Sequence, residues 1–209
     1  MQKPNYKFYP SLLDAYQWYV SSENENAEQE FIDKINRVPF TSLLADKGTL
    51  FNNFIDNSLD LWDKFGLSYV DGIAVEIVEK LQGSQKQVFT STTIEIDGII
   101  VELYGYLDYL KQDKVIDLKT TKTYDLGKFK NSLQLHFYPV SLIDNGCQIT
   151  EFEFLATDFE NVYSETYIVN YNESKAILIA KCKDLIHFIE SKRHLITDNK
   201  IFGLDNLSL

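Results

Sequence analysis

The stretch that decides the fold runs from Tyr104 to Tyr138 and reads YGYLDYLKQDKVIDLKTTKTYDLGKFKNSLQLHFY. It is predicted to contain the end of a strand over Ile99–Tyr109, a tight turn, a second strand over Val115–Thr120, a basic loop and the start of a helix. The Asp-Gly pair at 97–98 is a strong hairpin signal that joins the first of these strands to a preceding one. These strands are therefore expected to form a meander at the centre of the chain.

Two aspartates are expected to face each other across the second turn. Side chains alternate along a strand, so Asp117 shares a face with Lys119. If the turn centres between Gln112 and Asp113, Asp108 lies directly opposite Asp117, with the two Cβ atoms roughly 4.5–5.5 Å apart. Two carboxylates so placed repel each other unless a cation lies between them, and a divalent metal ion is the natural candidate. Because a one-residue slip in register turns every side chain to the opposite face, the alternative stays open that both carboxylates point into water.

The rest of the chain alternates between helical and strand periodicity. Helices are predicted over 10–20, 23–38, 47–65, 72–81, 132–145 and 172–194, and strands over 87–96, 99–109, 115–120, 148–156 and 163–170. Pro139 is expected to kink or restart the fifth helix. This order predicts an α/β protein with one mixed β-sheet flanked by helices. Residues 1–209 are expected to form a single domain, mainly helical over 1–82 and with an α/β core over 83–209.

Composition favours a folded, cytoplasmic protein. A hydrophobic content of 44%, including 14% aromatic residues, supports a packed core. No apolar run approaches the ~20 residues of a membrane helix, and the N-terminus lacks the apolar segment of a signal peptide. The net charge of −11 argues against a broad basic surface for nucleic acid. Six lysines against three aspartates between Lys111 and Lys130 still make a local positive patch, which a solvated loop explains equally well.

Several short motifs in this sequence resemble the PD-(D/E)XK nuclease superfamily, specifically its RecB-like exonuclease branch. The central ones are GYLD at Gly105–Asp108, VIDLKTT at Val115–Thr121 and QLHFY at Gln134–Tyr138. KGTLFN at Lys47–Asn52 is similar to the start of an upstream helix of that branch, and YPSLL at Tyr9–Leu13 to its N-terminal opening. The resemblance implies a restriction-endonuclease-like core and a Mg²⁺- or Mn²⁺-dependent deoxyribonuclease. Such an enzyme is a hydrolase of DNA phosphodiester bonds and, in this branch, an exonuclease.

The resemblance also implies the catalytic residues. Asp108 and Asp117 would be ligands of Mg²⁺ or Mn²⁺, together with the backbone carbonyl of Leu118, because hard cations prefer oxygen donors. Lys119 would orient or help deprotonate the attacking water and offset the charge of the phosphate. Asp108, Asp117 and Lys119 are therefore the expected catalytic set.

Further residues are expected to contact the substrate, which would be single- or double-stranded DNA. Gln134 and Tyr138, one helical turn apart, would contact the strand near the scissile phosphate, and Thr120 and Lys122 would bind it beside the catalytic lysine. Gln134 and Tyr138 could equally belong to the face of the helix that packs against the core. The acidic balance also permits a protein partner that presents the DNA, and no membrane partner is expected.

The sequence departs from the branch in two places. Asn52 stands where the branch usually has a histidine ligand, so it is expected to be a weak metal ligand at best. Glu76 or Glu79 is a candidate for a compensating carboxylate, although solvated helix positions explain both. Cys147 and Cys182 are too few and too far apart for the iron–sulphur cluster of many relatives. Asn52 therefore supports the alternative of a catalytically weakened module that binds nucleic acid or a protein partner without turnover.

Overall fold

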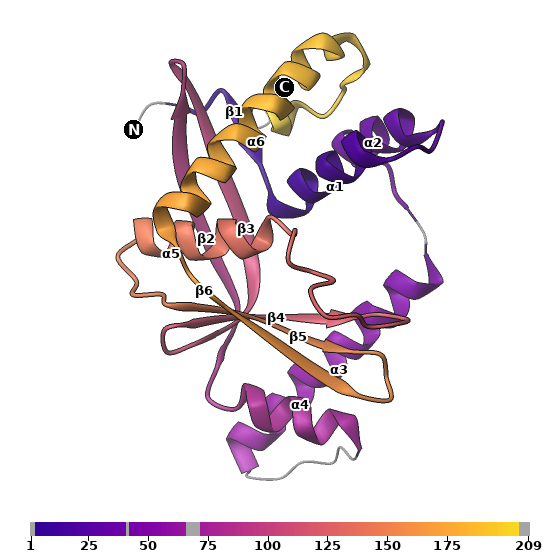
Figure 1. Cartoon of the computed structure of the whole chain (residues 1–209), viewed down its shortest axis with the longest axis vertical. Helices are drawn as coiled ribbons and strands as arrows, with labels where there is room; N and C mark the ends of the chain where they lie inside the picture. Colours follow the sequence, from indigo (N-terminus) through magenta and orange to yellow (C-terminus); the bar gives the residue numbers. More distant parts are fainter. Residues whose placement is uncertain (1–2, 41, 66–71, 205–209) are drawn as a thin grey trace, which may run out of the picture.

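The computed structural model describes residues 3–40, 42–65 and 72–204, and these residues form an α/β fold with one mixed, six-stranded sheet flanked by helices (Figure 1). The strands are β1 Tyr6–Phe8, β2 Gln85–Ile96, β3 Ile99–Lys111, β4 Lys114–Thr120, β5 Glu151–Thr157 and β6 Val162–Ile168. The helices are α1 Pro10–Ser21, α2 Ala27–Ile35, α3 Leu43–Phe65, α4 Ile73–Leu81, α5 Gln134–Asp144 and α6 Tyr171–Ser191. Two short 3-10 helices follow, Arg193–Leu195 and Asn199–Phe202.

The long strand β3 organises the sheet, because three strands pair with it. The antiparallel strand β2 follows one edge of β3 over its whole length, joined by the turn at 97–98, where both residues have positive φ. On the other edge, β1 runs parallel to residues 101–103, and β4 pairs antiparallel with residues 109–111. Beyond β4, β5 is parallel to it and β6 is antiparallel to β5. Strands β4–β6 therefore cross the upright β2–β3 hairpin at a steep angle (Figure 1).

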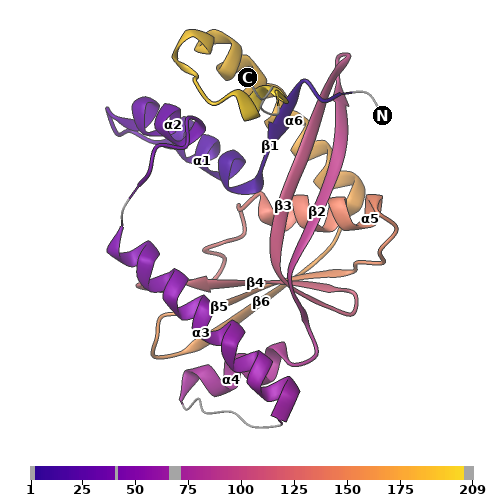
Figure 2. The same cartoon turned by 180° about the vertical axis from the view of Figure 1, so that it is seen from behind.

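The helices pack in two groups that enclose two hydrophobic cores. Helices α1, α5 and α6 share the larger core with β1, β2 and β3, and this core draws residues from Tyr6 to Ile201. Helices α3 and α4 cover β4–β6 from the other side, over a second core that runs from Ile55 to Leu155 (Figure 2). Both cores join residues before 82 to residues after 83, so the helical N-terminal part and the α/β part pack as one body.

The predicted α/β class and the mixed sheet are confirmed, while several element bounds differ. The helix predicted over 23–38 is shorter, at Ala27–Ile35, and the one predicted from 47 begins at Leu43. Pro139 lies inside α5, which is continuous, so the expected restart is wrong. The three-residue strand β1 was not predicted. No helix within residues 3–40, 42–65 or 72–204 is long and apolar enough to cross a bilayer.

Candidate active site

The expected register of the two central strands is confirmed. Lys111 pairs with Lys114 and Tyr109 with Ile116, so the next facing pair in this register is Asp108 and Asp117. The backbone ladder ends before that pair. There Asp108 Oδ2 accepts a hydrogen bond from the Leu118 amide at 3.0 Å. The carboxylate thus replaces the missing ladder partner at the point where β4 diverges from β3.

The two carboxylates lie in an environment that disfavours their charges. The Asp117 side chain is 3% exposed. Burial raises the pKa of Asp117, opposed by the nearby ammonium of Lys119. Burial and the neighbouring charge of Asp117 raise the pKa of Asp108 to about 7. Two acids with raised pKa values at a fork in a sheet are typical of a functional site.

Lys119 is held between Asp117 and the start of α5. Its Nζ lies 2.7 Å from Asp117 Oδ2 and donates to Gln134 Oε1 at 2.5 Å. Burial alone would lower the pKa of Lys119, but the surrounding carboxylates, with Asp117 first, outweigh it and raise that pKa. The side chain therefore stays an ammonium.

Asp14 on α1 is a third carboxylate beside this ammonium, and the sequence analysis did not identify it. Its Oδ1 accepts a hydrogen bond from the Leu133 amide at 2.5 Å, and its Oδ2 accepts one from Ser132 Oγ at 2.9 Å. Burial raises the pKa of Asp14, while these two bonds and the charge of Lys119 lower it. No local signal marks this residue, because its partners lie more than a hundred residues away in the chain.

Gly105 explains how the helices reach the strand here. A Cβ on this residue would lie 3.2 Å from Pro10 Cδ, at the start of α1, and 3.2 Å from Phe137 on α5. The missing side chain thus lets both helices approach β3 closely. Asp14 lies one turn along α1 from Pro10, and Gln134 begins α5, so this approach brings both residues to Lys119.

Helix α3 carries Asn52 to the same region. A Cβ on Gly48 would lie 2.6 Å from Thr120 Oγ1, and Asp56 Oδ1 accepts a hydrogen bond from the Tyr109 hydroxyl at 2.6 Å. Asn52 is one helical turn from each of these contacts, so it lies on the same face of α3. Its Oδ1 is buried and has no hydrogen-bond partner in the described part of the chain.

The donor set fits a hard divalent cation. Asp117 Oδ2 is likewise buried without an aligned hydrogen bond, although the Lys119 ammonium is close to it. Carboxylate and amide oxygens, such as those of Asp108, Asp117 and Asn52, are the ligand type that Mg²⁺ and Mn²⁺ prefer. Within residues 3–40, 42–65 and 72–204, no group of three or more His, Cys, Asp and Glu side chains could hold a metal.

Comparison with known proteins supports the fold. A solved structure described as "Crystal structure of SSO0001" is similar, with a TM-score of 0.55 and 13% sequence identity over 90% of this chain and 78% of that one. At this identity the likeness concerns the fold alone. No model of a known protein family matches the sequence, and neither does any curated protein.

The other predicted site residues divide into two groups. Thr120 and Lys122 lie directly beyond Lys119, at the end of β4, and Lys122 is exposed. Tyr138 is only 4% exposed, and its hydroxyl donates to the Tyr106 carbonyl at 2.7 Å. Tyr138 therefore packs against β3 in the interior and offers little surface to a ligand. The substrate contacts predicted for Gln134, Thr120 and Lys122 and the ligand role of the Leu118 carbonyl stay predictions.

Glu76 and Glu79 do not supply the missing carboxylate. Both side chains are exposed on α4, and Glu76 forms an ion pair with Lys80 at 3.8 Å. Besides Asp14, the structure brings Asp56 of α3 near, and its charge adds to the raised pKa of Asp108.

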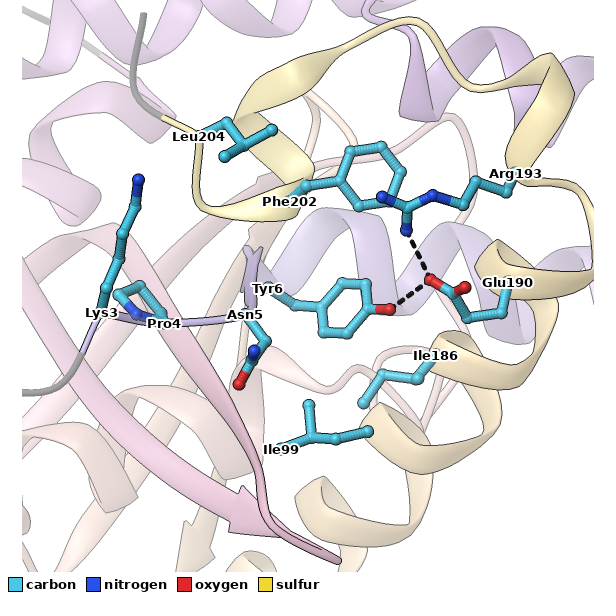
Figure 3. Close-up of a pocket in the computed structure, with 10 residues that line it drawn as sticks. All are labelled: Lys3, Pro4, Asn5, Tyr6, Ile99, Ile186, Glu190, Arg193, Phe202 and Leu204. Atoms are coloured by element: carbon cyan, nitrogen blue, oxygen red, sulfur yellow. Dashed lines mark hydrogen bonds and ion pairs between the residues drawn. The ribbon is translucent and has the colours of Figure 1, made fainter. Parts of the chain in front are cut away.

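A cavity of about 690 Å³ at the other end of β3 is separate from this site (Figure 3). In it, Glu190 accepts from the Tyr6 hydroxyl and pairs with Arg193, whose guanidinium lies over the Phe202 ring. Ile99, which lines the cavity, is nine residues from Asp108, or about 30 Å along an extended strand. Since these charged groups already pair with one another, the cavity offers no obvious ligand chemistry.

Proposed function

We propose that this chain is a metal-dependent nuclease of the PD-(D/E)XK type that hydrolyses DNA phosphodiester bonds, acting as an exonuclease. The observation that carries the proposal is the convergence of Asp108, Asp117 and Lys119 at the fork between β3 and β4. The motif resemblance points to the same three residues. The likeness in fold is compatible with the proposal without testing it.

Each residue has a distinct role in this proposal. Asp108, Asp117, Asn52 and the Leu118 carbonyl would hold Mg²⁺ or Mn²⁺, which supplies a more acidic water and a polarised phosphodiester. The Lys119 ammonium lies beside these oxygens and would stabilise negative charge that develops on the phosphate. Gln134 holds that ammonium in place through its Oε1.

A second candidate is a nuclease-fold module that binds nucleic acid or a protein partner without turnover. The observation that favours it is Asn52, whose neutral amide oxygen replaces the histidine of the resembling branch. A neutral oxygen binds a divalent cation more weakly than a charged carboxylate would, so a site that relies on it would have lower affinity and rate.

Degradation of end-labelled DNA with Mg²⁺ or Mn²⁺ tests the proposal. We expect the wild type to shorten linear single- or double-stranded DNA, and Asp117→Asn and Lys119→Gln to lose at least about a hundredfold in rate. Asp63→Asn, at an exposed position of α3, is the matched control. Circular single-stranded DNA distinguishes the modes, because only an endonuclease cuts it. A wild type as inactive as both variants with either metal would refute the enzyme and leave the binding module.

A further inference from the structure

A separate cleft opens directly beyond the catalytic lysine. Its volume is about 360 Å³, and it lies where the end of β4, the start of α3 and the β5–β6 turn meet. The lining residues are Lys47, Thr120, Thr121, Lys122, Asp158 and Phe159. Thr120 and Thr121 follow Lys119 by one and two residues, so the cleft lies about 3 to 7 Å further along the chain direction, at the end of β4 and on the side that faces α3.

The exposed Lys47 contacts an aromatic ring in this cleft. Its Nζ lies 3.6 Å from the centre of the Phe159 ring, and Phe51 packs edge-on against that ring at 5.3 Å. Phe159 itself has a φ of 74°, an uncommon conformation for a bulky side chain. A bond from its amide to Thr157 Oγ1 at 2.9 Å stabilises this turn. Strained backbone of this kind concentrates at binding sites, and here it aims a ring at an ammonium.

The cleft carries an excess of positive charge in an acidic protein. Lys122 is exposed, and Lys128 reaches the edge of the cleft, where it donates to Thr121 Oγ1 and the Thr123 carbonyl. The Asp158 carboxylate faces its own turn instead. It accepts from the Asn161 and Glu160 amides and from the Tyr163 hydroxyl, at 2.7–3.0 Å. Three ammonium groups and two threonine hydroxyls are thus opposed by one carboxylate that already has partners.

We propose that this cleft binds the phosphate adjacent to the scissile one on the same DNA strand, with Lys47 and Lys122 as its main ligands. This inference rests on the proposed nuclease function and names a subsite of it. The cleft begins one to two residues beyond Lys119, which is on the order of one nucleotide step along an extended strand. The cleft therefore fixes the register of the strand, while the two aspartates and Lys119 face the bond that is broken.

The double variant Lys47→Gln/Lys122→Gln tests the subsite with two substrates. One is a labelled single-stranded oligonucleotide, and the other is bis(4-nitrophenyl) phosphate, which has one phosphate and no neighbour. We expect the variant to lose at least about tenfold more in rate on the oligonucleotide than on the small ester. Lys200→Gln, an exposed lysine in the last short helix, is the control and should behave as the wild type.

Binding provides a readout that does not require turnover. Anisotropy of the oligonucleotide with the full chain, in Ca²⁺ instead of Mg²⁺, gives the slope of log affinity against log salt. Each lost phosphate contact on a single strand should reduce that slope by about 0.7. We expect the double variant to show this reduction and Lys200→Gln to keep the wild-type slope.

The outcomes separate the subsite from the nuclease. If the double variant loses the same factor on both substrates and keeps the wild-type salt slope, the cleft proposal is wrong and the nuclease proposal stands. A wild type that binds but does not cleave removes the nuclease function, yet a reduced slope in the variant would still support phosphate binding in the cleft. A wild type that neither cleaves nor binds overturns both.

Discussion

Asp14 and Leu133 lie 119 residues apart in the chain, and the Asp14 carboxylate accepts a hydrogen bond from the Leu133 amide at 2.5 Å. Leu133 directly precedes Gln134, whose Oε1 accepts from the Lys119 ammonium. The contact therefore ties the first helix to the residue that holds the candidate catalytic lysine. It makes α1 a part of the site, although no motif in that helix points to catalysis.

Removing this carboxylate should destabilise the protein. We expect Asp14→Ala to lower the free energy of unfolding by about 1–3 kcal/mol, because the buried Leu133 amide and Ser132 hydroxyl lose their acceptor. Asp14→Asn keeps one acceptor oxygen and should cost less. Urea denaturation measures both, with Asp63→Ala at an exposed helix position as the control. An Asp14→Ala protein as stable as that control would show that the contact contributes little.

Neutralising Asp108 should have the opposite effect on stability in metal-free buffer. The pKa of Asp108 is raised to about 7, so above that pH the folded protein carries a buried charge that lowers its free energy of unfolding. In a chelator at pH 8, we expect Asp108→Asn to raise the free energy of unfolding by about 1–3 kcal/mol while abolishing cleavage.

Addition of Mn²⁺ should reverse that order. A ligand at a hundred times its Kd stabilises the fold that binds it by about 2.7 kcal/mol, so the wild type should gain and Asp108→Asn should not. Thermal unfolding with and without Mn²⁺ measures this difference. Equal gains in both proteins would place the metal elsewhere, and a variant less stable than the wild type in chelator would contradict the cost of burying the Asp108 charge beside Asp117.

Replacing Asn52, whose amide oxygen is buried, should also affect stability differently without metal and with Mn²⁺. Asn52→Ala removes a polar atom that has no partner among the described residues, so the metal-free protein should lose nothing and gain up to about 1 kcal/mol. Asn53→Ala, at the exposed neighbouring position, corrects for the better helix propensity of alanine. In Mn²⁺ the Asn52 variant should be stabilised less than its control. If both variants respond to Mn²⁺ alike, Asn52 is not a ligand.

The facing aspartates could be predicted because two local rules fix them. A two-residue turn at 112–113 sets which residues oppose each other, and alternation then sets the faces. Asp14 could not be found in this way, since its role depends on a helix and a loop that only the tertiary fold brings together. The strand β1 is too short to show a period. Asn52 was identified by resemblance, but only the structure shows that its oxygen is buried without a donor.

Asp144, at the end of α5, should make the free energy of unfolding depend on pH in the acid range. Burial would raise the pKa of Asp144, but bonds from Thr92 Oγ1, at 2.5 Å, and from the Tyr171 hydroxyl, together with Lys175, hold it below its usual value. A carboxyl whose pKa is lower in the folded state stabilises the fold at pH values above its unfolded-state pKa of about 3.9. This contribution is lost as the pH falls through the folded-state pKa.

We therefore expect Asp144→Asn to be less stable than the wild type by about 1–2 kcal/mol above pH 5, a modest value because the side chain is 21% exposed. Below pH 4 the difference should shrink toward zero. Urea denaturation of both proteins at a series of pH values measures it. A difference that stays constant through the acid range would mean that the amide replaces the carboxylate fully.

The close contact of α3 with β4 can be tested by a double-mutant cycle at Gly48 and Thr120. In an exposed helix, glycine to alanine stabilises by about 1 kcal/mol, but here the new Cβ would lie 2.6 Å from Thr120 Oγ1. We expect Gly48→Ala to destabilise the wild type by about 1 kcal/mol and to stabilise the Thr120→Ala background. Thr120→Val is the matched control, because it keeps the branched shape and should keep the clash. If Gly48→Ala changes stability equally in all three backgrounds, the helix does not approach β4 as closely as the structure has it, and the proposed ligand role of Asn52, one turn further along α3, loses its support.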